Sequence, residues 1–193
     1  DSGYDSSEVG FAFGTGFEQY DNLFFSPSFK TVAEKLETNS LASSSIKKQE
    51  GSYFTSTVAY SFDYDLRNQK FQTTDGFRAK FTQRLPVVSD SNTITTGFIF
   101  DKYLSLGDFT TSAGLFLKNA VGLSDDVRIS ERLALPRNRL RGFKPGRIGP
   151  VDQGEDHVGG NYAAALSLTT NLPMIAPTLQ DFEFNYFLDF SRF

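Results

Sequence analysis

Apolar and polar residues alternate along most of the chain with a period of two, which is typical of β-strands. The clearest case is residues 53–66, where Phe62 and Tyr64 lie on one side and Asp63 and Asp65 on the other. Helical patterns with a period of 3.6 are scarce, so the sequence predicts an all-β protein. The alternation predicts about eight strands, over residues 8–18, 22–35, 53–66, 77–85, 94–104, 109–119, 162–172 and 182–190.

Short and long connections between these strands roughly alternate. Residues 19–21 and 105–108 are tight links, residues 67–76 form a moderate one with a turn signal, and residues 86–92 are polar. The long connections are residues 38–51 and 122–160. Antiparallel strands with tight turns at one end of a sheet and loops at the other give this rhythm. We therefore expect one antiparallel sheet with its long loops at one end.

Two environments explain strands that have one aromatic face. In a soluble sandwich the aromatic face packs inward, whereas in a membrane barrel it meets lipid and the polar face lines a lumen. The cations Arg78, Lys80 and Arg84 share one face of residues 77–85 and suit either a lumen or a solvated surface. Periodicity alone leaves this choice open.

Composition agrees with this alternation and excludes several classes of protein. The 193 residues include 21 Phe and 8 Tyr, 15% aromatics, in a chain of mean hydropathy −0.31. Large apolar side chains are therefore interleaved with polar ones. Zero Cys excludes disulfide scaffolds, Cys-based metal sites and a thiol nucleophile, and the single His excludes poly-His metal centres.

Net charge and the absence of certain motifs limit the possible partners and reactions. A net charge of −4 argues against a nucleic-acid partner. No nucleophile–base set, phosphate loop or metal-ligand spacing appears, so we expect no enzyme activity and no metal site. The first residue is Asp1 rather than Met, so we expect the chain to begin inside a longer or processed protein.

The connection 122–160 is the chain's longest break in alternation. Loops of this length in compact domains are usually functional or disordered. If the loop folds into a lumen, each of its cations needs a partner. It holds seven of them, Arg128, Arg132, Arg137, Arg139, Arg141, Lys144 and Arg147.

Three motifs carry a resemblance to a known family. The loop contains Arg141-Gly142-Phe143, then Ile148-Gly149-Pro150, then Gly159-Gly160-Asn161 at the start of a strand. The turn after residue 64 contains Asp65, Arg67, Phe71, Thr73, Asp75 and Gly76, and the last strand contains Phe187-Leu188-Asp189-Phe190. This order resembles the outer-membrane protein assembly family within the bacterial surface antigen superfamily, which includes the bacterial Bam-type insertase and the mitochondrial sorting-and-assembly barrel.

The resemblance implies a fold and a topology. It implies that residues 1–193 are a single-domain, internal fragment of a transmembrane antiparallel β-barrel of about sixteen strands. The long loops, including residues 122–160, would be extracellular, and the turn with Asp65 and Gly76 would be periplasmic. Phe193 is then interpreted as a cut edge of the barrel.

The resemblance also implies roles for individual residues. Arg141 would pair in the lumen with Asp189, which period two places on the polar side of its strand. Gly142 would permit a backbone turn, and Phe143 would anchor the loop against the wall. The chain departs from the family at Thr169, where Bam-type members often have Glu, and at Phe190, where Gly is common.

The function implied is the assembly and insertion of other β-barrel proteins into the outer membrane of Gram-negative bacteria, without enzymatic chemistry. The partners implied are outer-membrane lipid, unfolded outer-membrane proteins and accessory lipoproteins. Two alternatives stay open at this point. One is a transport pore, porin-like or of the two-partner secretion type, and the other is a soluble β-sandwich binding module.

Overall fold

The computed structural model describes residues 4–40, 42, 44–144, 146–172 and 184–193. In this part of the chain nine strands form one sheet, with three helical turns between them. The strands are β1 (Tyr4–Gly14), β2 (Phe17–Tyr20), β3 (Leu23–Thr38), β4 (Gly51–Asp65), β5 (Gly76–Ser89), β6 (Thr93–Leu106), β7 (Phe109–Gly122), β8 (Tyr162–Asn171) and β9 (Asn185–Arg192). The helical turns are α1 (Ser44–Lys47), η1 (Ile129–Glu131) and η2 (Arg137–Arg139).

Every pairing in the sheet is antiparallel, in the order β1-β3-β4-β5-β6-β7-β8-β9. Strands β1 and β2 both pair with β3, so they form one strand interrupted at Thr15 and Gly16. The expected antiparallel all-β fold is confirmed. A sandwich of two packed sheets is not formed in the described residues.

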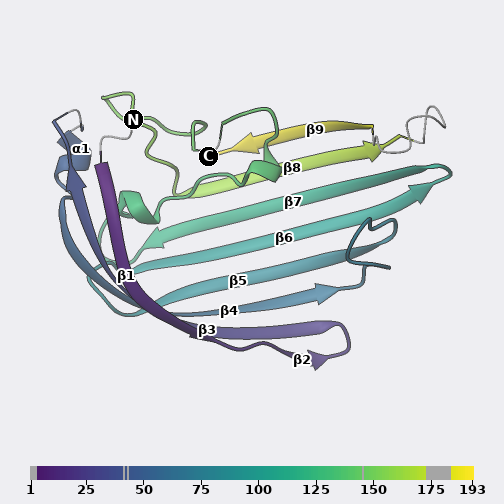
Figure 1. Ribbon diagram of the computed structural model, residues 1–193, viewed down its shortest axis with the longest axis horizontal. Coiled ribbons are helices and arrows are strands. Elements are labelled where there is room, and N and C mark those ends of the chain that lie inside the picture. Colours follow the sequence, from purple (N-terminus) through teal and green to yellow (C-terminus); the bar gives the residue numbers. More distant parts are fainter. Residues whose placement is uncertain (1–3, 41, 43, 145, 173–183) are drawn as a thin grey trace.

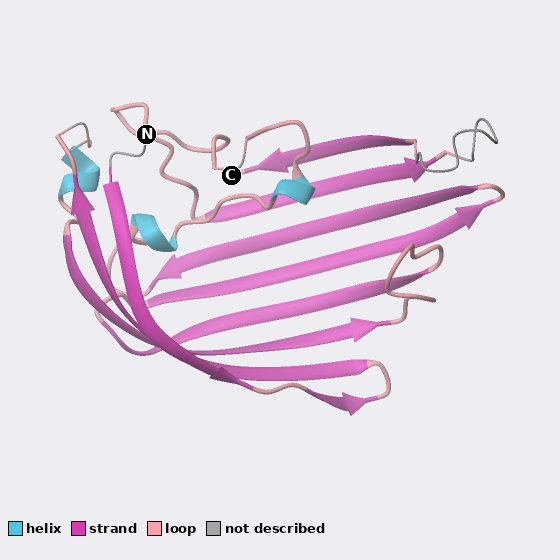
Figure 2. Ribbon diagram, viewed as in Figure 1, coloured by secondary structure: helices cyan, strands magenta, loops and turns pink. Residues whose placement is uncertain are grey.

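The sheet curves around the long connection between β7 and β8, and α1 lies beside the loop end of the sheet (Figures 1 and 2). We call the face that carries this connection the inner face and the opposite one the outer face. Strands β1 and β9 are the two ends of the strand order. No helix in the described residues is long and apolar enough to cross a membrane.

Register places the alternating side chains as the sequence predicts. Along one row Phe62 pairs with Phe81, and Phe81 with Phe98, all on the outer face. One residue along, Asp63 pairs with Lys80 on the inner face. Outer-face rings contact one another across and along strands, at centroid distances of 4.9–6.3 Å, in the pairs Phe11–Phe29, Phe25–Phe62, Tyr60–Phe62, Tyr60–Phe81, Tyr64–Phe77 and Phe77–Phe100.

Successive connections lie alternately at the two ends of the sheet, although the short β5–β6 connection lies at the same end as the long β7–β8 loop (Figure 1). The β3–β4, β5–β6 and β7–β8 connections lie at one end, and the turns with Asn22 and Gly107 lie at the other. The expected loop 86–92 is shorter than predicted, because β5 continues to Ser89 and only residues 90–92 connect the strands. A bulge in β5 leaves Val87 without a partner opposite Ser56 and Thr57, and it lies next to Pro86, which has no N–H to donate.

The predicted strand 182–190 is formed from Asn185 onward, and its first two residues lie outside the described part of the chain. The predicted loop 122–160 extends over residues 123–161, because β7 ends at Gly122 and β8 begins at Tyr162. Asn161, expected to open the strand, lies just before it and accepts a hydrogen bond from the Ala120 N–H at 2.7 Å.

The main apolar cluster lies between this loop and the inner face of β7 and β8. Alanines on that face leave room for loop side chains to approach the sheet backbone. The cluster comprises Phe116, Ala120, Val127, Leu133, Leu135, Ala163 and Ala165, with Ile99, Leu140 and Phe193 packed against it. Burial of these side chains therefore stabilises the loop against the inner face of the sheet.

Candidate functional site

Arg141 and Asp189 form a bidentate ion pair across the inner face. Arg141 follows η2 in the loop, and Asp189 projects inward from β9. The Arg141 Nε donates to Asp189 Oδ2 at 2.8 Å and Nη2 donates to Oδ1 at 2.6 Å. The Arg141 backbone N–H donates to Oδ2 as well, at 2.9 Å. Because the Asp189 side chain is only 3% exposed, the loop arginine is what satisfies this carboxylate.

Two further residues complete the surroundings of Arg141. Its Nη2 donates to Thr169 Oγ1 at 3.0 Å, and its guanidinium carbon lies 4.0 Å from the ring centroid of Phe187. Thr169 pairs with Phe187 in the β8–β9 register, so both project to the inner face. A neutral hydroxyl thus occupies the place where the family often has a carboxylate. Phe187 had no predicted role, although period two places it beside Asp189.

The charge state of Arg141 follows from this geometry. Hydrogen bonding to Asp189 raises the pKa of the Arg141 guanidinium above its ordinary value, against the opposing effect of burial. The guanidinium therefore keeps the charge that arginine ordinarily carries. Its fork of donors fixes the loop by direction as well as by charge.

The other two residues of the Arg-Gly-Phe motif, Gly142 and Phe143, differ in how well they match their expected roles. Gly142 has φ +87°, a backbone conformation that favours glycine, and nothing lies within 4 Å of the position of a Cβ. Glycine is needed there for the turn rather than for space. Phe143 was expected to anchor against the wall, but its side chain is 57% exposed. That expectation is wrong, because Phe143 borders Leu135 at the exposed side of the loop, and Leu135 makes the buried apolar contact with the sheet instead.

The glycines that follow form a seat for Phe193. A Cβ on Gly149 would lie 3.2 Å from the Phe193 ring, and a Cβ on Gly160 would lie 3.0 Å from it. Gly160 also exchanges two backbone hydrogen bonds with Leu133, at 2.8 and 3.0 Å. Gly159 has φ +71° and would place a Cβ 2.9 Å from the Leu133 carbonyl oxygen. The Phe193 ring therefore packs into the loop, a role that its interpretation as a cut edge did not include.

Ile148 and Pro150 border a small hairpin within the loop. Ile148 lines a hollow with Leu135 and Phe143. The Pro150 carbonyl accepts a hydrogen bond from the Val158 N–H at 3.1 Å. An isolated antiparallel bridge between Val151 and His157 continues this hairpin.

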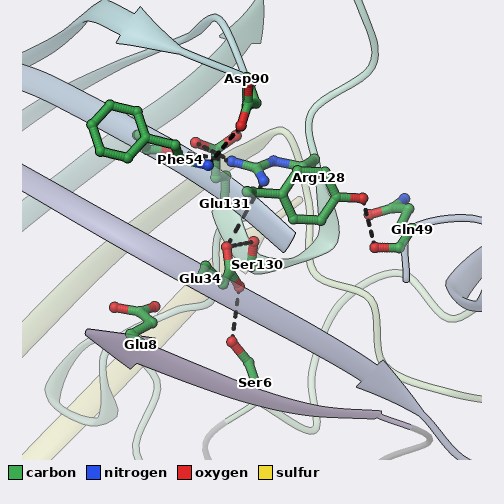
Figure 3. Close-up of polar contacts among 12 residues, drawn as sticks. Ser6, Glu8, Glu34, Gln49, Phe54, Asp90, Arg128, Ser130 and Glu131 are labelled. Atoms are coloured by element: carbon green, nitrogen blue, oxygen red, sulfur yellow. Dashed lines mark hydrogen bonds and ion pairs between the residues drawn. The ribbon is translucent and has the colours of Figure 1, made fainter. Parts of the chain in front are cut away.

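A second polar cluster fixes the beginning of the loop, around Arg128 (Figure 3). The Arg128 Nη2 donates to Thr55 Oγ1 at 3.2 Å, and its guanidinium lies 4.1 Å from the Tyr53 ring centroid. Its nitrogens lie 3.9 Å from Glu34 and 3.8 Å from Glu131. The Arg128 side chain is 11% exposed, so its charge is balanced inside the protein rather than by water.

Hydrogen bonds from η1 extend this cluster to neighbouring elements. Ser130 donates to Glu34 at 3.1 Å, and Ser6 of β1 donates to the same carboxylate at 2.8 Å (Figure 3). Glu131 accepts a hydrogen bond from Thr93 of β6 at 2.7 Å and another from Ser91. The beginning of the loop is thereby joined directly to β3, β4 and β6, and to β1 through Glu34. No sequence motif indicated these contacts, since the loop residues and their strand partners lie 38 to 96 positions apart in the chain.

The turn with Asp65 and Arg67 lies at the opposite end of the sheet. Arg67 donates to both oxygens of Asp65, at 2.8 and 2.7 Å. This hydrogen bonding raises the pKa of the Arg67 guanidinium. Gly76 has φ +99°, and a Cβ there would lie 2.1 Å from the Leu66 carbonyl oxygen. The ion pair and the glycine therefore both define the turn.

Other predicted residues of this turn have lesser roles. Phe71 is 81% exposed, and Thr73 donates to the Gln69 carbonyl at 2.7 Å. Asp75 lies 3.9 Å from Lys102, with both side chains exposed. Asn68, which was not predicted, organises the turn, because its Oδ1 accepts three backbone N–H bonds, from residues 69, 74 and 75. An asparagine in a polar turn is the signal that identifies such a residue.

No group of three or more His, Cys, Asp or Glu side chains in the described residues is arranged to hold a metal ion. The two polar clusters of the loop are instead made of arginine–carboxylate pairs. These pairs hold the loop on the inner face in one position, and such attachment is what their chemistry can provide.

Comparison with known proteins gives a family match and a solved structure of the same fold. The family model of the Omp85 superfamily domain matches residues 1–193. The crystal structure of BamA from Haemophilus ducreyi lacking POTRA domains 1–3 has the same fold, with a TM-score of 0.83 and 19% sequence identity. The match covers 97% of this chain and 42% of the BamA chain. No curated protein matches the sequence.

At 19% identity the structural likeness shows the fold, and the family model shows the relationship. The resemblance carried by the loop and turn motifs is confirmed at this level. The strand pattern, the loop on the inner face and the family match agree, and the chain belongs to the Omp85 superfamily.

Proposed function

We propose that this chain forms part of the wall of a barrel that assembles and inserts β-barrel proteins into the bacterial outer membrane. The observation that carries the proposal is the clamp of Arg141 on Asp189, which holds the long loop on the inner face. The same residues were predicted to pair by resemblance to the Bam-type insertase. The match to the Omp85 superfamily supports this reading.

The two faces of the sheet support a location in the outer membrane of Gram-negative bacteria. The outer face carries contacting aromatic rings, which suit lipid chains, and the inner face carries charged pairs such as Arg78 with Asp63. In this placement the β3–β4, β5–β6 and β7–β8 connections are extracellular. The turn with Arg67 is then periplasmic.

The proposed activity is mechanical rather than enzymatic, with no cofactor. Unfolded outer-membrane proteins would be admitted edge to edge by strand addition, in which backbone hydrogen bonds supply the affinity. The residues described here would give that process a wall of fixed curvature. The clamp contributes by joining the loop to β8 and β9 through Thr169 and Asp189. Accessory lipoproteins are proposed partners of the same assembly.

Charge reversal in the full-length protein tests this proposal. We expect Arg141→Glu and Asp189→Arg each to lower assembly of a reporter barrel in proteoliposomes, because each replaces an attractive ion pair on the inner face by two like charges. The double variant restores the opposite charges and is expected to recover part of the activity. Arg147→Glu, at an exposed loop cation, is the matched control and is expected to behave like the parent.

Unchanged assembly in both single variants would contradict the proposal. Folding is followed separately, by the shift in gel mobility on heating that folded barrels show. A variant that folds but assembles poorly locates the defect in function. A variant that fails to fold locates it in the wall itself.

A second candidate function is a transport pore of the same superfamily. The observation that favours it is the row of inner-face cations that includes Arg84 and Lys118, which line a polar cavity of about 210 Å³ under the loop. Steady conductance of the full-length protein in planar bilayers, with anion preference lost in Arg84→Gln, would favour the pore. Bilayers that show no steady conductance, together with active assembly of the reporter barrel, would favour the insertase.

A further inference from the structure

A second arginine of the loop, Arg139, is attached to a different strand. It is the last residue of η2, and only 9% of it is exposed. Its Nη1 donates to Asp101 Oδ1 at 2.8 Å, and its Nη2 donates to Asp101 Oδ2 at 3.2 Å. Asp101 projects from the inner face of β6 and its side chain is 19% exposed. This is a second bidentate pair made by the long loop, about as enclosed as that of Arg141.

The backbone of β7 is adapted to this second pair. Gly114 lies opposite Asp101 in the β6–β7 register. A Cβ on Gly114 would lie 2.5 Å from Arg139 Nη1 and 2.7 Å from Asp101 Oδ1. Gly114 has no positive φ that would require glycine. The absence of a side chain therefore serves to admit the ion pair.

The two arginines pair with carboxylates on two different strands. Arg141 binds Asp189 on β9 and a neutral hydroxyl of Thr169, whereas Arg139 binds Asp101 on β6. A polar cavity of about 170 Å³, lined by both arginines, separates the pairs. The loop therefore holds the inner face on both sides of β7 and β8.

We infer that the Arg139–Asp101 pair is a second attachment of the loop, which positions residues 132–143 on β6 independently of the Arg141–Asp189 pair. Gly114 is the residue that makes room for it. Arg139 and Asp101 are positioning residues, because they act by holding the segment that carries Arg141. The inference concerns loop position, so it stands or falls separately from the proposed assembly function.

A thiol reporter in the loop tests this inference. The chain has no cysteine, so Leu135→Cys adds one thiol to it at a residue 9% exposed in the apolar cluster under the loop. The full-length protein is held in outer-membrane vesicles, and the rate of maleimide labelling reports how often the loop leaves the wall. All variants are compared with the Leu135→Cys parent.

We expect Arg139→Gln and Asp101→Asn each to raise the labelling rate by about tenfold, because each leaves a buried charge without its partner. Gly114→Ala is expected to do the same with both charges kept. Arg137→Gln is the matched control, an exposed arginine of the same η2 turn, and should label at the parent rate. The charge swap of Arg139→Asp with Asp101→Arg is expected to slow labelling again.

Independence of the two attachments is read from a combination. If they act separately, Arg139→Gln with Arg141→Gln should label at about the product of the single increases. A double variant no faster than Arg141→Gln alone would overturn the inference. So would parent-rate labelling of folded Asp101→Asn and Gly114→Ala proteins, which test the pair without altering Arg139.

Discussion

At the scale of single residues, the described chain places its arginines by geometry as much as by charge. Arg141, Arg139 and Arg67 each present two N–H donors to the two oxygens of one carboxylate. A planar fork matches a carboxylate in one orientation, so each pair sets direction as well as distance. Attachment of the loop is therefore selective in position, which apolar packing alone would not ensure.

Thr169 gives a prediction at this scale. Thr169→Val keeps the shape of the side chain but leaves Arg141 Nη2 without that acceptor, so we expect the free energy of unfolding to fall by about 1 kcal/mol. Urea unfolding of the full-length protein in lipid measures the change. Thr169→Ser retains the hydroxyl and serves as the control, and equal losses in both variants would show that the methyl group matters rather than the hydrogen bond.

The Arg141–Asp189 pair was within reach of the sequence, and the Arg139–Asp101 pair was not. A motif names Arg141, and period two places Asp189 on the polar face. Arg139 looks like any of the seven loop cations, because its partner lies 38 positions earlier on another strand. Only the path of the loop across the sheet brings Arg139 to Asp101, and that path follows from packing that no local pattern encodes.

At the scale of elements, alternation predicts the strands well and their ends less well. The interior of each strand follows period two, because the outer face is apolar along the sheet, while the inner face is largely polar except under the loop, where residues such as Phe116 and Ala163 are apolar. The ends depend on backbone details, such as the bulge that lets β5 continue past Pro86. The break at Gly16 between β1 and β2 is of the same kind. Such irregularities leave the faces intact, so the sequence pattern survives them.

The turn before β5 gives a prediction at the scale of elements. Gly76→Ala forces a side chain into a backbone conformation with φ +99° and against the Leu66 carbonyl, so we expect a loss of about 2 kcal/mol or more in unfolding free energy. Gly107→Ala is the control, because Gly107 also has a positive φ but open space around it. It should lose about 1 kcal/mol. Equal losses would mean that the close approach to Leu66 is unimportant.

At the scale of the whole molecule, the loop acts as a tie across the curved sheet. Its beginning is bound to β3, β4 and β6 around Arg128, and its middle is bound to β6 and β9 through Arg139 and Arg141. The sheet order runs from β1 to β9, so these contacts connect strands near both ends of it. Such ties restrict changes in curvature.

The Arg128 cluster yields a prediction at this scale. Glu34→Gln removes one of the two carboxylates near a guanidinium that is 11% exposed, so we expect the segment 127–131 to open more often. Hydrogen exchange of its backbone amides should become faster by about tenfold. Glu37→Gln, at an exposed position of the same strand, is the control. Unchanged exchange in Glu34→Gln would show that hydrogen bonds and packing hold the segment without the charge.

The central claim is that the Arg141–Asp189 pair locks the loop to the wall. A double-mutant cycle on the unfolding free energy of the full-length protein tests it most directly, with Arg141→Ala, Asp189→Ala and the double variant. We predict that the two residues are coupled by about 1.5 kcal/mol or more, with the double variant losing less than the two single losses together. A coupling within about 0.3 kcal/mol of zero would contradict the claim.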